Sequence, residues 1–396
     1  MLTPYLPYPT NSGGQIRSNN LIKHLSKKHE ITLCSLIKND EDKKYIGKLK
    51  PYCKNIYIFK RPEKPFTISN ILKTGFSFDP LLVIRNFSPS EKKALPKIIE
   101  EGDFDIIHAE TFYVYPHIPR TKIPVVLVDQ TIEYEVYEHY VKNYRSPFLK
   151  PILYIDVLKI RYWESFYWRK AARVIAVSSK DAEVMKKTVP GLKVDIIPNG
   201  VGDDFTDDVA THFNKIVLFM GNYAWLQNSE AARVLAKEVF PKILEIHPDC
   251  NLIIAGQFTE KIKDLENENI KVLDFDIDDI KSVQKYFRES GILVAPLYGP
   301  GGSRLKILSA MAARLPVVTT KVGISGIEAE NGKEVLIGES AEEIANLASK
   351  LFNDKKFYEK IAVNAREFVE KNYFYGAIAK KLDRVYQEVR NANTDS

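Results

Sequence analysis

The sequence predicts an α/β protein with two doubly wound domains, each built on a parallel sheet that helices cover on both faces. A length of 396 residues is more than one ordinary core accommodates. Short runs rich in β-branched residues recur along the chain, and they are continuously apolar, as strands buried on both faces are. Helical patterns such as residues 18–28 separate these runs, which requires crossover connections and therefore parallel strands.

The first half of the chain contains five predicted strands. They are EITLCSL from Glu30, FDIIHAE from Phe104, VVLVDQ from Val125, VIAVSS from Val174 and VDIIPN from Val194. Only residues 1–3 precede the first proline, which is short for the central first strand of such a sheet, so we expect the native chain to begin a few residues upstream.

The second half repeats the same alternation and gives the domain boundaries. Its predicted strands are IVLFMG from Ile216, NLIIAG from Asn251, IKVLDF from Ile270, GILVAPL from Gly291, PVVTT from Pro316 and EVLIG from Glu334. A Pro-Asn-Gly turn within residues 196–205 marks the change of domain. We predict domains at 1–200 and 201–375 and a helix at 376–396 that packs back on the first domain. Ligands should bind where the two domains face each other across a cleft.

The charge and the cysteines narrow the class of protein. The net charge is +6, but residues 1–200 hold 32 Lys and Arg against 21 Asp and Glu, whereas the remainder hold 25 against 30. A basic half suits nucleic acid, an anionic membrane or a phosphate-bearing substrate, and charge alone does not select among them. Three widely spaced cysteines form neither a disulfide framework nor a zinc motif, and no histidine spacing indicates a metal, so we expect a cytoplasmic protein without a metal site.

Two glycine-rich loops stand where a strand passes into a helix. The first, TNSGGQIRSNN, contains Gly13 and Gly14, and the second is GPGGSRLKIL from Gly299. Glycine lets the backbone approach a ligand, and the N–H groups of the following helical turn bind anions. Arg304 and Lys306 oppose the helix dipole by about 0.3–1 kcal/mol each, a cost that a bound anion reverses. The alternatives are a tight turn and a solvated helix face, but the cations favour a phosphate site, and Arg17 is a weaker signal of the same kind.

Several motifs together resemble glycosyltransferase family four, which comprises retaining, nucleotide-sugar-dependent enzymes of GT-B fold. They are PYLPYPTNSGGQIR, VIAVSS, IIPNGV, FMGNYAWLQNSEAA and APLYGPGGSRLKILSAMAARLPVVTT, and the last resembles a subgroup with a GGxRLK loop. The resemblance implies transfer of a sugar from a UDP- or GDP-sugar to a glycan or lipid-linked acceptor in cell-surface polysaccharide synthesis. It implies no cofactor and no bound metal.

The resemblance also assigns residues. It places the donor against Gly221, Asn222, Gly302, Ser303, Arg304 and Leu305, with Lys306 added for its charge, and the nucleobase near Phe275 and Asp276. It also implies that Gly13 and Gly14 face the diphosphate or the acceptor from the other domain.

This sequence departs from the family pattern at several of these positions. Gly301 and Ser309 stand where two glutamates eight residues apart are common, so Ser309 offers the ribose a neutral hydrogen bond in place of charge-assisted ones. The loop GNYAWLQNSEA lacks the usual Arg and Lys, for which Arg304 and Lys306 are the natural substitutes. Relatives often read His-Asn around the position of Gln130, which can hydrogen-bond a sugar hydroxyl without titrating.

The sequence offers one further candidate residue for catalysis and leaves two alternative functions open. His108, at the end of a buried strand, is the titratable candidate for catalysis. A nucleotide-sugar epimerase of the same fold and a nucleotide-sugar-binding protein without activity stay open as alternatives.

A stretch of the basic half interleaves aromatic and basic residues. Residues 144–173, with residues 64–78, are able to contact an anionic membrane at its inner face, although an aromatic helix packed on the sheet gives the same pattern. No nucleic-acid-binding motif is present.

Overall fold

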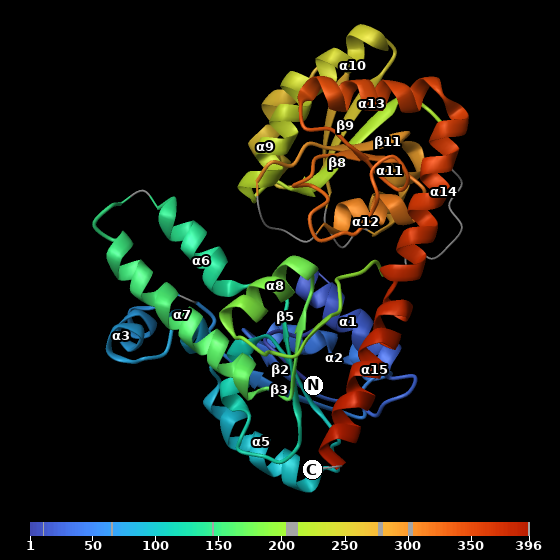
Figure 1. Ribbon diagram of the computed structural model, residues 1–396. Coiled ribbons are helices and arrows are strands. Elements are labelled where there is room, and N and C mark those ends of the chain that lie inside the picture. The colour runs from blue at the N-terminus through green and yellow to red at the C-terminus, as the bar shows by residue number, and fades with distance from the viewer. Residues whose placement is uncertain are drawn as a thin grey trace. The chain divides into compact units, whose positions relative to one another are not determined.

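The computed structural model describes residues 1–10, 12–64, 66–144, 146–202, 213–275, 280–299 and 304–394. The chain divides into two compact units (Figure 1). Unit 1 comprises Met1–Pro198 and Ile378–Ser396, and unit 2 comprises Asn199–Ala377.

Unit 1 contains a seven-stranded parallel sheet of order β3-β2-β1-β4-β5-β6-β7. The strands are β1 Leu2–Thr3, β2 Thr32–Ile37, β3 Asn55–Lys60, β4 Ile107–Glu110, β5 Val125–Asp129, β6 Arg173–Ala176 and β7 Val194–Ile196. The five strands predicted in this half are confirmed. The sequence reading missed β3, because this edge strand alternates between exposed and half-buried residues and lacks a continuous apolar run.

Helices cover both faces of the unit 1 sheet. They are α1 Gly13–Leu25, η1 Asp40–Tyr45, α2 Ile46–Leu49, α3 Ile68–Phe76, α4 Leu81–Asn86, α5 Pro89–Glu101, η2 Phe112–His117, α6 Glu133–Lys142, α7 Lys150–Lys170, α8 Ser179–Thr188 and α15 Tyr375–Thr394. The start of α6 is capped from α7, since the Glu164 carboxylate accepts from the N–H groups of Glu133 at 2.9 Å and Tyr134 at 3.2 Å. This contact fixes the two helices as a pair.

Unit 2 contains a six-stranded parallel sheet of order β10-β9-β8-β11-β12-β13. Its strands are β8 Ile216–Asn222, β9 Asn251–Gln257, β10 Ile270–Asp274, β11 Ile292–Ala295, β12 Val317–Thr319 and β13 Leu336–Ile337. All six correspond to predicted runs. Its helical segments are α9 Leu226–Val234, η4 Leu235–Val239, α10 Phe240–Ile246, η5 Thr259–Leu265, α11 Ile280–Glu289, α12 Leu305–Ala312, α13 Ala341–Asn353 and α14 Lys355–Asn372.

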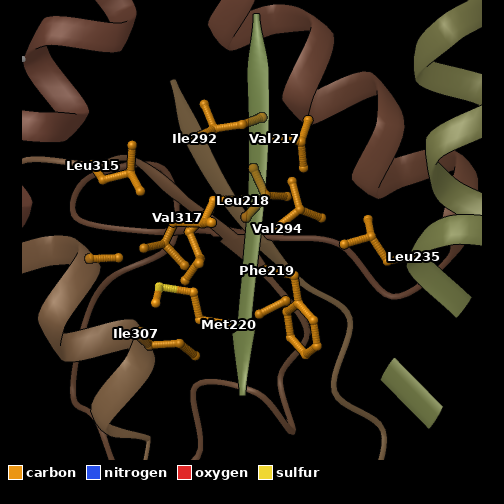
Figure 2. Packing of buried hydrophobic residues seen from close by; sticks show 14 of the residues in the cluster. Val217, Leu218, Phe219, Met220, Leu235, Ile292, Val294, Ile307, Leu315 and Val317 are labelled. Carbon is orange, nitrogen blue, oxygen red and sulfur yellow. The ribbon is translucent and has the colours of Figure 1, made fainter. Parts of the chain in front are cut away.

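The core of unit 2 lies around β8. Val217, Leu218 and Phe219 are fully buried between neighbouring strands and helices, and Ile307 of α12 packs into the same cluster (Figure 2). The continuous apolar run that predicted this strand is therefore explained by its central place in the sheet. The core also fixes where α12 begins relative to the carboxyl end of β8.

Most of α15 belongs with unit 1. Asp383 accepts from Lys28 at 2.8 Å and contacts His29 at 2.9 Å, and the Tyr386 hydroxyl bonds Nδ1 of His108 at 2.6 Å. The hydrogen bond from Lys28 holds the pKa of Asp383 below its usual range.

The two parallel sheets confirm the prediction of two α/β domains. No helix in the described residues is long and apolar enough to span a membrane.

Candidate functional site

The strongest candidate site lies in unit 2 at the carboxyl ends of β8 and β9, where two glycines let the strands approach closely. A Cβ on Gly256, which has φ of 146°, would lie 1.8 Å from the carbonyl oxygen of Gly221. A Cβ on Gly221 would lie 3.1 Å from Cγ of Asn228 and 3.2 Å from Nζ of Lys306. Only glycine fits at position 256, because a side chain there would collide with the backbone of β8. At position 221, the end of β8 lies directly beside the amine of Lys306.

Lys306 is the central cation of this site. It lies in the first turn of α12, and its ammonium donates to Oδ1 of Asn228 at 2.7 Å and lies 4.5 Å from the ring centroid of Phe219. Burial, with a smaller contribution from the charge of Arg304, lowers the pKa of Lys306 to about 7. The partner of the amine is a neutral amide, so an anion arriving here meets a positive charge that no carboxylate pairs in the described contacts.

The start of α12 adds to this character. Among the described residues, no side chain caps its first turn, and that turn contains no acidic residue. Arg304 at the N-cap position donates from Nη2 to the carbonyl of Val322 at 2.9 Å, and burial lowers the pKa of its guanidinium. Leu305 follows as the first helical residue. The positive end of the helix dipole and two cations thus lie at one helix end, which is the arrangement that binds phosphate.

Asn222, which the resemblance placed against the donor, is hydrogen-bonded within its own loop and to Gln257. Its side chain donates to Oε1 of Gln257 at 2.9 Å and accepts from the N–H of Ala224 at 3.0 Å, while its carbonyl accepts from Asn228 at 2.8 Å. Both ends of the side chain are therefore engaged within the protein. Asn222 shapes the loop that orients Asn228 and, through it, Lys306.

The other donor residues predicted in unit 2 are either half-buried in the structure or lie outside the described residues. Phe275 is half-buried, its N–H donates to Gly256 at 3.0 Å, and its ring stacks on Tyr286 with centroids 5.7 Å apart. Ser309 is half-buried in the second turn of α12. The predictions for Asp276, Gly301, Gly302 and Ser303 lie outside the described residues.

A second polar cluster lies at the carboxyl edge of the unit 1 sheet. Glu110 ends β4; its carboxylate contacts Nε2 of His108 at 3.1 Å and accepts from the amide of Gln130 at 2.7 Å. The same amide donates to the Tyr5 hydroxyl at 3.2 Å. A Cβ on Gly14 would lie 2.0 Å from that hydroxyl, so the second glycine of the first loop makes room for Tyr5.

Burial sets the protonation states in this cluster. It lowers the pKa of His108, whose ring is therefore neutral, with Nε2–H donating to Glu110 and Nδ1 accepting from Tyr386. For Glu110, burial raises the pKa, but the hydrogen bond from His108 and the charge of Arg17 outweigh it, and the net shift is downward. An ionised carboxylate thus lies between two neutral partners and the guanidinium of Arg17, whose Nε is 3.8 Å from Oε1 of Glu110, and it is suited to fixing their orientation.

Two residues predicted for the site occupy buried structural positions in unit 1. Arg17 is completely buried and donates from Nη1 to the carbonyls of Ile197 at 3.0 Å and Pro198 at 2.9 Å. His108 is 4% exposed, and both its ring nitrogens are engaged. These contacts tie Arg17 to the segment that follows β7, and tie His108 to Glu110 and Tyr386. Gln130 is half-buried.

The sequence reading missed three residues of these clusters. Glu110 stands two residues after His108 at the end of the same strand, a position from which it could have been inferred. Asn228 and Tyr5 gave no local signal, because their roles depend on contacts with distant segments.

The backbone is strained directly after Glu110. Thr111, a β-branched residue, has φ of 81°, and such strain is concentrated at functional sites.

Comparison with known proteins identifies the family. The model described as "Glycosyltransferase Family 4" matches residues 12–205, and the one described as "Glycosyl transferases group 1" matches residues 214–354. The chain is a family 4-like glycosyltransferase. Among curated relatives, this glycosyltransferase is 23% identical to an uncharacterized 44.6 kDa protein in the cps region of Klebsiella pneumoniae, over 93% of the chain and 94% of the relative. It is also 29% identical to an uncharacterized glycosyltransferase of Methanocaldococcus jannaschii, over 44% and 45% of the two chains.

Solved structures show the same fold for the whole glycosyltransferase chain. A sucrose-phosphate synthase from Thermosynechococcus elongatus aligns with a TM-score of 0.68 at 14% identity, covering 99% of this chain and 98% of the other. The HepE protein of Anabaena in complex with UDP and glucose aligns with a TM-score of 0.63 at 15% identity, covering 98% of both. WaaG, a glycosyltransferase involved in lipopolysaccharide biosynthesis, aligns with a TM-score of 0.59 at 16% identity, covering 97% and 98%. The fold is therefore GT-B.

Proposed function

We propose that the chain transfers a sugar, with retention of anomeric configuration, from a UDP- or GDP-sugar to a glycan or lipid-linked acceptor in cell-surface polysaccharide synthesis. Two related proteins support the substrate class: HepE was solved with UDP and with UDP-glucose, and the Klebsiella relative is encoded in a cps region. We place the enzyme in the cytoplasm, in peripheral contact with an anionic membrane.

The position of Lys306 is the observation that carries this proposal. The amine lies beside Gly221, at the end of the central strand and within the first turn of α12. A donor diphosphate bound there would accept from the ammonium and from the helix N–H groups. Lys306 and Arg304 would then supply the positive charge that stabilises the leaving nucleotide, without a metal or cofactor. The second turn of α12 would bring Ser309 toward the ribose.

In the transfer step, the bond from the anomeric carbon to the diphosphate breaks and a bond to the acceptor oxygen forms on the same face. The departing diphosphate takes the acceptor proton, so the protein mainly positions the two substrates. Gln130 suits that work in unit 1, because its amide nitrogen is fixed by Glu110 and Tyr5. Its carbonyl oxygen is then the group left to receive a sugar hydroxyl.

The proposal is tested by titrating the protein with UDP, GDP and UDP-glucose in a calorimeter. We expect one nucleotide to bind and Lys306→Met to weaken its binding by about 10- to 100-fold, because a hydrogen bond to a charged group contributes about 1.5–3 kcal/mol. Lys360→Met, at an exposed position of α14, is the matched control and should bind as wild type does.

Two results would contradict the proposal. Binding by Lys306→Met with wild-type affinity would remove the amine from the donor site, and binding of no nucleotide by a folded protein would favour a chain without activity. Conversion of the bound donor to an epimer without an acceptor would identify the other enzyme class.

A further inference from the structure

Unit 1 exposes a large apolar surface on α3, on α7 and on the residues that directly precede each of these helices. We define this apolar surface by its exposed side chains, which are Phe66, Ile68, Ile71, Leu72, Phe76, Phe148, Leu149, Ile152, Ile155, Leu158 and Tyr162. Phe76 is 90% exposed, Phe148 87% and Ile68 79%. More than half of the large hydrophobic side chains that are exposed in the described residues lie in residues 66–78 and 136–162. Monomeric proteins rarely leave a contiguous apolar area of this kind open to water.

The exposed side chains follow helical spacing. Ile68, Leu72 and Phe76 are four residues apart on α3, and Ile152, Ile155 and Leu158 are three apart on α7, so each helix turns one apolar face outward. The opposite face of α7 is also apolar, since it buries Val157, Ile160 and Trp168 in the core. The outward face is therefore additional to what the fold needs.

Specific contacts join the two helices into one surface. Lys159 of α7 donates to the carbonyls of Thr74 at 2.6 Å and Ser77 at 2.8 Å, at the end of α3. Trp163 donates from Nε1 to the carbonyl of Phe78 at 3.0 Å, and Figure 1 shows α3 beside α7. These bonds accept at backbone carbonyls, so they do not depend on which side chains α3 turns outward.

Basic residues surround the apolar surface. Residues 64–78 and 136–162 contain seven Lys and Arg but only two acidic residues. Glu138 pairs with Lys142 at 3.1 Å, and Asp156 accepts from the N–H of Leu81 at 3.0 Å, so both acids have structural partners. The basic residues of the two segments therefore outnumber the acidic ones, and Lys73 is exposed at the rim of the surface.

An apolar groove between α6 and α7 continues this surface. Its volume is about 490 Å³, and it is lined by Val141, Lys142, Lys150, Pro151, Tyr154, Ile155 and Leu158. Two lysines therefore stand at a groove whose other walls are mostly apolar. A phospholipid presents the matching chemistry, an anionic head above an acyl chain.

We propose that the apolar surface docks on an anionic lipid bilayer, with its apolar side chains entering the interfacial layer and the surrounding lysines contacting the head groups. The combination of an apolar face with a basic rim is that of interfacial amphipathic helices. This proposal rests on the proposed function, whose peripheral membrane contact it assigns to the apolar surface, and the docking itself needs neither donor nor acceptor.

Vesicle flotation of the full chain, without substrates, tests the docking. We expect binding to vesicles of phosphatidylcholine mixed with phosphatidylglycerol, weak binding to phosphatidylcholine alone, and release as salt is raised. Ile152→Glu combined with Phe76→Glu should abolish binding. Lys73→Glu, which reverses one charge at the rim, should weaken binding at least about fivefold, since each basic residue near the surface contributes about 1 kcal/mol.

Ile246→Glu, at an exposed position of α10 in unit 2, is the matched control and should bind vesicles as wild type does. Nucleotide titration of every variant separates the two proposals. A variant that no longer binds vesicles but still binds nucleotide has lost only the function of the apolar surface. The docking is overturned if the wild type ignores anionic vesicles, or binds neutral and anionic vesicles equally. It is also overturned if the wild type self-associates in sedimentation and only that association is lost in the glutamate variant, because the surface is then a contact between two copies.

Discussion

The carboxyl edges of the two sheets differ in how their charges are paired. In unit 1, Glu110 accepts from Gln130, contacts His108 and lies 3.8 Å from the guanidinium of Arg17, so its charge is paired within the protein. In unit 2, Lys306 is half-buried beside glycine and bonds a neutral amide. A paired carboxylate network orients neutral groups, whereas a cation without a carboxylate partner favours an anionic ligand. The difference suits unit 2 to a nucleotide diphosphate and unit 1 to sugar hydroxyls.

Gly256→Ala is the change expected to have the largest effect. A Cβ there would lie 1.8 Å from the backbone oxygen of Gly221, and alanine rarely adopts φ of 146°. Because the oxygen belongs to the backbone of a central strand and cannot move aside as a flexible side chain does, we expect a loss of about 3 kcal/mol or more in the free energy of unfolding, with loss of nucleotide binding. Urea unfolding followed by circular dichroism measures the first and calorimetry the second.

Gly47→Ala is the control for that change. Nothing lies within 4 Å of its Cβ position in α2, so its stability should change little. Equal stability of Gly256→Ala and wild type would mean that β8 and β9 can separate, and that the end of β8 is not a fixed platform for Lys306.

Much of this architecture is readable from local sequence, and the sites are readable only in part. The runs of β8 and β11 are continuous and apolar, which predicts buried strands directly. The cations of α12 likewise stand out against the helix dipole. By contrast, the pairing of Lys306 with Asn228 spans 78 positions, and that of Gln130 with Tyr5 spans 125. Tertiary packing brings such pairs together, and no local pattern encodes them.

Gly14→Ala should have a smaller and more selective effect, confined to unit 1. Its Cβ would displace the Tyr5 hydroxyl and so remove one of the two bonds that fix the amide of Gln130. We expect kcat to fall by about tenfold with unchanged nucleotide affinity, because a misplaced positioning group lowers the rate and not donor binding. Steady-state kinetics and nucleotide titration measure the two effects.

Gly14→Ala combined with Tyr5→Phe refines that test. Removing the hydroxyl relieves the shortest contact, so protein stability should partly recover while kcat stays low, since the bond to Gln130 is still missing. If Gly14→Ala instead weakens nucleotide binding, the first glycine loop contacts the donor, as the resemblance implies, and the division of tasks between the two edges is wrong.

The smallest expected effect is a pH dependence of donor affinity that only unit 2 produces. The pKa of Lys306 is about 7 in the free protein, and a bound diphosphate raises it by favouring the ammonium form. Above about pH 7 the free protein must take up a proton on binding, so the dissociation constant should rise about tenfold per pH unit until the pKa of the complex is reached. Below that range this group contributes no slope. UDP-glucose is the suitable ligand, since its diphosphate does not titrate there, and calorimetry in buffers of different ionisation enthalpy should detect uptake of nearly one proton. Lys306→Met should bind weakly with a flat profile. A slope that survives in this variant would assign the titration to another group and leave Lys306 without the role that distinguishes the two sheet edges.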